Sequence, residues 1–160
     1  MNMFWEELIA SMPDPRQLTR LLIRLVIAML LGALVGIQRE RTGKPAGLRT
    51  HMLVSMGAAL FVIAPIELGM SLDGLSRIIQ GIVTGIGFIG GGAILKLVNE
   101  REIEGVTTAA GIFLTAASGV AVGLGRIGLA VISAILALIT LSWIGRLEYR
   151  IEEGLRNKRK

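Results

Sequence analysis

The chain has 160 residues, 52% of them hydrophobic, and its mean hydropathy of +0.67 is well above that of a typical soluble domain. It contains no cysteine and a single histidine, which excludes disulfides, thiolate metal sites and multi-histidine zinc sites. The formal net charge is +5, but an aromatic content of 4% gives no stacking platform for bases, so we expect no nucleic-acid partner.

Five apolar stretches fill most of the chain, and each is long enough, or nearly so, to cross a bilayer as a helix of about 20 residues. They predict an all-α membrane protein, with residues 1–160 forming one transmembrane domain, a bundle of five transmembrane helices in contact with the lipid bilayer. The predicted spans cover residues 20–38, 49–66, 77–97, 106–125 and 127–145, and a short basic cytoplasmic tail follows at 146–160. Arg24 lies inside the first span, so we expect its side chain to reach outward to the headgroups.

Lysine and arginine are concentrated in two places beside the ends of predicted helices. The loop over residues 38–51 carries four of them, and the tail carries six. Short loops rich in lysine and arginine stay on the cytoplasmic side of a membrane. We therefore expect this loop and the C-terminus to be cytoplasmic and, with five spans, the N-terminus to lie outside.

The loop between the first two spans holds the densest group of polar residues. Pro45 and two glycines favour a compact turn, and Thr50 is expected to cap the second helix. Glu40 lies among four cations, so we expect it to be ionised and paired. One interpretation is an anchor that sets the topology; the other is a cytoplasmic gate or binding loop. The members of that gate would be Arg39, Glu40, Lys44, Gly47, Arg49, Thr50 and His51.

Many of the 21 glycines lie inside the apolar stretches, which indicates close contact between helices. Four pairs have the spacing G-x-x-x-G: Gly32/Gly36, Gly81/Gly85, Gly87/Gly91 and Gly119/Gly123. One small bundle does not need so many, and we therefore expect a homo-oligomer, with a dimer favoured. Leucine at Gly119 and Gly123 should then disrupt association.

The third span is densely populated with glycine between Gly85 and Gly92. Each glycine disfavours the helix, so we expect local unwinding near the middle of the membrane, where irregular backbone can line a wet cavity. The alternative for the glycines is a tight helix crossing. Threonine and serine hydroxyls on the third and fourth spans could face the same path; the alternative for them is a hydrogen bond to a carbonyl of their own helix. The residues of a transmembrane path would be Thr84, Gly85, Gly87, Gly90, Gly91, Gly92, Thr107, Thr108 and Ser118, with Asp73, Arg77 and Gln80 at its outer rim.

The spacing of arginine and glycine is echoed between the first and third spans. Arg24 precedes Gly32 by eight residues, and Arg77 precedes Gly85 by eight. The echo favours a parallel repeat of a two-helix unit followed by a fifth helix. Chance is the alternative in a chain with so much glycine.

At these motifs the chain resembles the MgtC/SapB family of bacterial inner-membrane proteins. Three segments carry the resemblance, residues 32–57, 84–94 and 105–110, and the first is quite specific. It implies a five-helix membrane domain in the inner membrane, with the N-terminus outside, linked to growth at low magnesium and to survival in host cells. Members of the MgtC branch carry a C-terminal ACT-type domain, whereas this chain ends at Lys160, which indicates a short form. Two positions depart from the family pattern, with the acid displaced to Asp73 and the glutamine to Gln80.

The sequence supports two functional hypotheses, neither of them enzymatic, because it shows no nucleophile–base pair and no set of metal ligands. In the first, the protein supports magnesium homeostasis by moving an ion or small solute along a path at the third helix. Mg²⁺ would be its substrate or regulator, and no cofactor is expected. In the second, it is a regulator that transports nothing and binds another membrane complex, such as a transporter or ATP synthase. Flux in liposomes separates the two.

Overall fold

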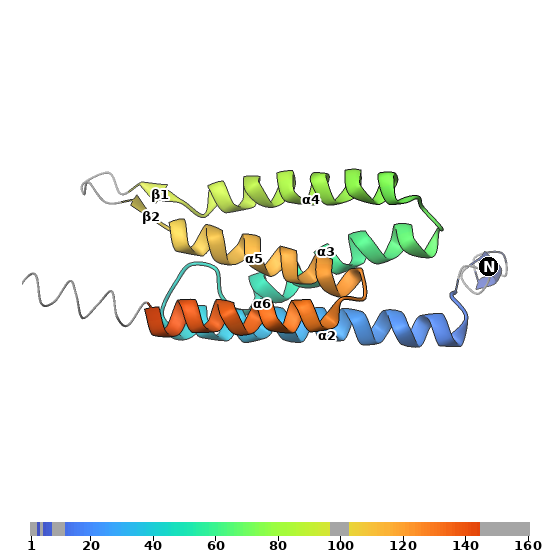
Figure 1. Cartoon of the computed structure of the whole chain (residues 1–160), viewed down its shortest axis with the longest axis horizontal. Helices are drawn as coiled ribbons and strands as arrows, with labels where there is room; N and C mark the ends of the chain where they lie inside the picture. The colour runs from blue at the N-terminus through green and yellow to red at the C-terminus, as the bar shows by residue number, and fades with distance from the viewer. Residues whose placement is uncertain (1–2, 4, 8–11, 97–102, 145–160) are drawn as a thin grey trace, which may run out of the picture.

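The computed structural model describes residues 3, 5–7, 12–96 and 103–144 (Figure 1). Its elements are α2 Pro15–Arg41, α3 Leu48–Glu67, α4 Leu72–Gly92, β1 Leu95–Lys96, β2 Ile103–Glu104, α5 Val106–Gly123, α6 Ile127–Ile139 and the π-helix η1 Thr140–Ile144. The helices α2 to α5 are long and apolar enough to cross a membrane, which confirms the prediction of a helical membrane bundle. The predicted tail, residues 146–160, lies outside the described residues.

The last helix is shorter than the other four. Its apolar part, Ile127–Trp143, rises about 26 Å at 1.5 Å per residue, somewhat less than the hydrocarbon thickness of about 30 Å. The fifth crossing, and with it the outside position of the N-terminus, therefore stays a prediction.

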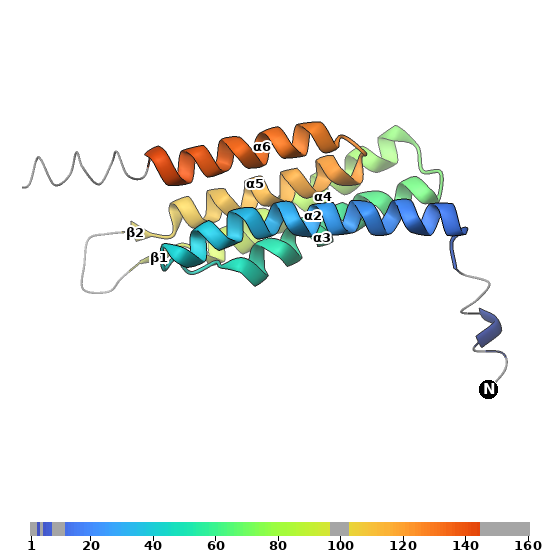
Figure 2. The same ribbon diagram turned by 90° about the horizontal axis from the view of Figure 1, so that it is seen from below.

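The helices lie side by side along one axis, and their connections gather at two opposite ends of the bundle (Figures 1 and 2). One end holds the basic α2–α3 loop, the β1–β2 hairpin and the C-terminal end of the last helix. The other end holds the start of α2 and the α3–α4 and α5–α6 turns. The basic α2–α3 loop thus lies at the same end as the C-terminal end of the last helix, and we call this end the basic end.

Two glycines let α2 and α3 approach each other at backbone distance. A Cβ atom on Gly32 would overlap the carbonyl oxygen of His51, and one on Gly36 would lie 2.7 Å from the Cα of Leu48. A larger residue at either position would force the two helices apart, since backbone atoms cannot move aside as a flexible side chain can.

The opposite side of α3 meets α5 in the same way. A Cβ atom on Gly119 would overlap the carbonyl oxygen of Ser55, and one on Gly123 would lie 2.8 Å from the carbonyl oxygen of Ala59. The prediction that this glycine pair mediates contact between copies is therefore wrong: it is used inside one chain, between α3 and α5.

An apolar core fills the half of the bundle nearest the α5–α6 turn. It is built from small and branched side chains of α2, α3, α5 and α6: Ala28, Leu31, Ala59, Ile63, Ala121, Val122, Ala130 and Ala134. The polar side chains described below occupy the other half.

The helix α4 lies at the edge of the bundle (Figure 1) and stays α-helical from Leu72 to Gly92, so the predicted unwinding is wrong. An unpaired backbone group costs several kcal/mol in lipid, more than the ~1 kcal/mol that one glycine costs a helix. The helix begins at residue 72 rather than 77, because the Oγ of Ser71 accepts a hydrogen bond from the N–H of Gly74 at 3.3 Å. It ends before the predicted residue 97, and the chain continues into the antiparallel β1–β2 pair.

The echo between the first and third spans is not matched by equivalent packing. Gly32 contacts the backbone of α3, whereas a Cβ atom on its counterpart Gly85 would have no neighbour within 4 Å in the part of the chain that the structure describes. Of the glycines from 85 to 92, Gly90 alone packs against a neighbour, since its Cβ would lie 3.5 Å from the Cβ of Ala109. The parallel repeat stays a prediction.

Candidate functional site

Arg39 lies in the last turn of α2 and points into the bundle, with 4% of its surface exposed. It follows Gly32 and Gly36 at spacings of seven and three residues, so all three share the helix face that meets the rest of the bundle. Its Nη2 donates a hydrogen bond to the Oγ1 of Thr108 on α5, while its Nε is buried and has no hydrogen-bond partner among the described residues. The observed partner of this cation is therefore a neutral hydroxyl.

His51 lies one turn into α3 and is fully buried. Its Nδ1 is 2.7 Å from the Oγ1 of Thr115, whose hydroxyl donates at 2.8 Å to the carbonyl oxygen of Gly111. The threonine has one hydroxyl hydrogen and Gly111 accepts it, so Nδ1 of His51 must carry the hydrogen that it donates to Oγ1. The Nε2 atom is buried, with no hydrogen-bond partner in the part of the chain that the structure describes.

Two more polar side chains extend this group. Ser55 follows His51 by one helical turn, is fully buried, and its Oγ has no hydrogen-bond partner in the described part of the chain. Gln38 donates from Nε2 to the carbonyl oxygen of Leu141 in the π-helix at 3.1 Å, while its Oε1 is buried and unpaired among the same residues. A buried polar atom left unpaired costs about 1–3 kcal/mol. Such atoms mark positions where water or a small polar solute can bind.

We call Arg39, His51, Ser55, Thr108 and Thr115 the polar cluster. It joins α2, α3 and α5 in the half of the bundle nearest the basic end. The guanidinium of Arg39 is its charged donor, and the Nε–H of that group has no partner among the described residues, which suits an anion or a solute with acceptor groups.

Glu40 stabilises the start of α3, in a role that the sequence did not suggest. Its Oε2 accepts a hydrogen bond from the N–H of Leu48 at 2.9 Å, and Gly47 is the residue before the helix. A Cβ on Gly47 would lie 2.9 Å from the same Oε2, so glycine leaves room for the carboxylate. The predicted cap is wrong: Thr50 lies inside the helix, and the capping group comes from Glu40, eight residues before Leu48.

The predicted gate residues divide into two sets. Arg39 and His51 are buried, whereas Glu40, Lys44 and Arg49 are exposed, and Thr50 and Gly47 are partly buried. The exposed charges suit a topology signal, and the two buried residues do not. The structure thus separates an outer basic loop from an inner polar cluster.

The hydroxyls of α5 also divide. Thr108 and Ser118 are buried, but Thr107 is exposed. The Oγ of Ser118 donates to the carbonyl oxygen of Leu114 at 3.0 Å and lies 3.2 Å from the Oγ of Ser133 on α6. Hydroxyls on the buried face of α5 therefore continue from the polar cluster toward the apolar core.

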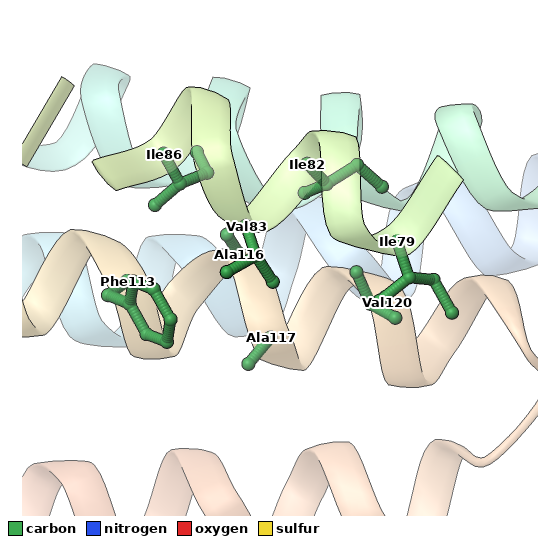
Figure 3. Close-up of a pocket in the computed structure, with 8 residues that line it drawn as sticks. All are labelled: Ile79, Ile82, Val83, Ile86, Phe113, Ala116, Ala117 and Val120. Carbon is green, nitrogen blue, oxygen red and sulfur yellow. The ribbon is translucent and has the colours of Figure 1, made fainter. Parts of the chain in front are cut away.

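The structure does not bring the predicted path residues of α4 together with those of α5. Thr84 is exposed and donates to the carbonyl oxygen of Gln80 at 2.9 Å, and Gly85, Gly87, Gly91 and Gly92 are also exposed. The face of α4 that meets α5 forms an apolar pocket (Figure 3), which is lined by Ile79, Ile82, Val83, Ile86, Phe113, Ala116, Ala117 and Val120.

Arg24 and the predicted outer-rim residues lie toward the end of the bundle opposite the basic end. Arg24 donates from its Nη1 at 3.2 Å to the carbonyl oxygen of Gly123, at the C-terminus of α5, and its predicted reach to the headgroups stays a prediction. The predicted outer-rim residues Asp73, Arg77 and Gln80 are exposed on α4 and contribute nothing to the polar cluster.

Sequence reasoning left Gln38 out of the gate, missed Ser55 and did not connect Thr115 with His51. A signal was available in the spacing, since Ser55 follows His51 by four residues and Thr115 follows Thr108 by seven. Residues at these spacings lie on one helix face. The spacing could not show that this face of α3 packs against this face of α5.

Four membrane-length apolar helices around a buried polar cluster define a multi-pass membrane protein. The chain belongs to the MgtC family, whose sequence profile matches residues 25–150.

Protein SrpB of Synechococcus elongatus is 43% identical over 136 residues, which cover 78% of this chain and 75% of SrpB. The "Putative magnesium transporter YhiD" of Escherichia coli K12 is 43% identical over 138 residues, covering 81% of this chain and 63% of YhiD. Protein MgtC of Salmonella typhimurium LT2 is 40% identical over 117 residues, covering 73% of this chain and 49% of MgtC. No solved structure gives a significant match. The chain spans less than two thirds of YhiD and about half of MgtC, so the activities of those whole proteins are not established for it.

Proposed function

We propose that the protein supports magnesium homeostasis by moving a small ion or solute across the membrane, with the polar cluster as its cytoplasmic gate. Membership of the MgtC family and the name of YhiD supply the connection with magnesium. The observation that carries the proposal is the buried guanidinium of Arg39, hydrogen-bonded to the neutral hydroxyl of Thr108. Ionisable side chains inside a membrane bundle are costly, and they mark ion and solute pathways.

The position of the cluster supports a gate that opens from one side. Thr108 and Ser118 are ten residues apart, so hydroxyls cover about 15 Å of the buried face of α5. Beyond Ser118 the apolar core around Ile63 and Val122 closes the bundle. The structure therefore resembles a closed state, in which polar groups extend inward from the basic end and stop at an apolar seal.

The chemistry of the cluster favours an anion, or a solute with acceptor groups, as the transported species. The guanidinium of Arg39 is a cationic donor, whereas Mg²⁺ is itself a cation and binds oxygen ligands with near-octahedral geometry. Mg²⁺ would then act as a regulator or cross together with the anion. A path that continued along the exposed residues of α4 would need a neighbouring molecule to enclose it.

The test is flux into liposomes that contain the purified chain. Mg²⁺ entry is followed with an internal fluorescent indicator, and anion entry with labelled chloride and phosphate. We expect one of these probes to enter faster than into empty liposomes, and Arg39→Gln to remove the difference. Arg49→Gln is the matched control, because Arg49 carries the same charge near the same end but is exposed. Wild-type rates equal to those of empty liposomes for all probes would reject transport.

A second candidate is a regulator that binds another membrane complex. It is favoured by the exposure of α4: 11% of its most apolar 18-residue stretch is buried inside the bundle, against 56% of the corresponding stretch of α5. In that case all probes stay outside the liposomes, while the chain still supports growth at low magnesium in cells.

A further inference from the structure

The polar residues of α4 lie on the face turned away from the bundle. At 100° per residue, six positions fall within about 40° of one line along the helix. These positions, the α4 stripe, are Asp73, Arg77, Gln80, Thr84, Gly87 and Gly91, and all of them are exposed. The buried Leu75 and Ile86 and the half-buried Ile82 lie on the opposite side, where α4 meets its neighbours.

This arrangement is the reverse of what lipid favours. A helix at the edge of a membrane bundle is stable with apolar side chains toward lipid, and an amide or carboxylate there costs free energy unless it finds a partner. Thr84 satisfies its hydroxyl within the helix by donating to the carbonyl oxygen of Gln80. The amide of Gln80 lies about 12 Å along the helix from its start at Leu72, beyond the charged residues of the first turns.

The chemistry of the stripe is complementary to itself. We propose that it binds the α4 stripe of a second copy of this chain, related by a two-fold axis along the membrane normal. Across such an axis each residue meets the same residue at the same depth. Gln80 carries both donors and an acceptor, so two copies can exchange hydrogen bonds. Asp73 and Arg77 have opposite charges one turn apart, so the long side chain of Arg77 can reach along the contact to Asp73 of the second copy and offset the repulsion between the like charges that face each other across the axis.

The half of the stripe nearer the basic end supplies the room that this contact needs. Gly87 and Gly91 are four residues apart, and no atom of the described residues lies within 4 Å of a Cβ placed on either. Pairs with this spacing let two backbones approach closely in lipid. The close glycine pairs on α2 and α5 are used inside the chain, so α4 is where the predicted self-association has free glycines. This contact does not depend on the proposed transport.

The test uses the absence of cysteine from the chain, so that each variant has a single thiol. Thr84→Cys places it on the stripe, and Val83→Cys places it at nearly the same depth but about 100° around the helix. Leu136→Cys places it on the exposed side of α6, where 58% of the leucine is exposed. Native membranes are treated with a mild oxidant, and disulfide-linked dimers are measured on a non-reducing gel.

We expect Thr84→Cys to form dimers several-fold more than either control. Adding Gln80→Leu to Thr84→Cys should weaken dimerisation roughly 3- to 20-fold, the range for hydrogen bonds between helices in membranes. Equal yields at the three positions, a preference for Leu136→Cys, or a cross-link to a different protein would each overturn the proposal. An unchanged yield with Gln80→Leu would overturn the self-pairing of Gln80. None of these outcomes depends on whether any solute crosses the membrane.

Discussion

Replacing Thr108 by valine tests the contact that holds the buried Arg39. Valine has nearly the same shape as threonine, and Thr108 is 1% exposed, so the change removes a hydroxyl without opening a cavity. It leaves Nη2 of Arg39 without its hydroxyl partner, in addition to the unpaired Nε. We expect the free energy of unfolding to fall by about 1–3 kcal/mol, the cost of a buried donor without a partner.

A double-mutant cycle shows whether this loss belongs to the pair. Arg39→Met removes the charge and keeps an apolar chain of similar length, so the hydroxyl of Thr108 can turn to its own helix. With both changes no donor is left stranded, and we expect a coupling of about 1 kcal/mol or more between the two sites. The four proteins are compared by unfolding in mild detergent with increasing SDS.

The control is Thr107→Val, because Thr107 is the exposed neighbour of Thr108 on the same helix. It should change the free energy of unfolding by no more than about 0.5 kcal/mol. Effects of Arg39→Met and Thr108→Val that add to within about 0.3–0.5 kcal/mol would refute the reasoning, because residues that do not interact behave in that way.

Three further predictions concern the cap of α3 and the packing. Glu40→Ala should lower the free energy of unfolding by about 1 kcal/mol through loss of the cap on α3, while Glu40→Gln keeps an acceptor and most of the stability; equal thermal unfolding of both would contradict the capping role. Gly119→Leu should prevent folding, because its side chain would enter the backbone of α3, whereas Gly85→Leu should fold normally. Size-exclusion chromatography after detergent extraction should show a folded peak for Gly85→Leu and aggregate for Gly119→Leu; a folded peak for Gly119→Leu would contradict the packing of α3 on α5. Gly105→Ala should lower the midpoint of thermal unfolding, because Gly105 has φ +95 and its Cβ would overlap the carbonyl oxygen of Ala93; an unchanged midpoint would show that the β1–β2 hairpin can move aside.

The helical bundle could be predicted from the sequence because lipid imposes a simple rule. Backbone groups must be paired within each span, so long apolar stretches become helices whatever their detailed composition. The same rule explains the error at α4, where the glycines from 85 to 92 suggest an unwound helix. Their low propensity is a smaller effect than the cost of unpaired backbone groups in lipid.

The functional side chains were harder to predict, because spacing specifies a face of a helix but not its neighbour. The spacing of Gly119 and Gly123 correctly indicates close approach, but the partner is α3 of the same chain. The sequence places Arg39 in a basic loop, since four cations occur close together there. Its burial follows from Gly32 and Gly36 on the same face, which let α2 pack against the bundle, and that consequence needs the three-dimensional arrangement.

The central claim, that the polar cluster gates transport, is tested most directly by flux through Thr108→Val and Thr107→Val incorporated into liposomes at equal density. The two variants lose the same hydroxyl from adjacent positions of α5, one buried against Arg39 and the other exposed. We expect Thr107→Val to transport the active probe at the wild-type rate and Thr108→Val to change that rate at least several-fold. Equal wild-type rates for both variants, with both proteins folded, would contradict the claim.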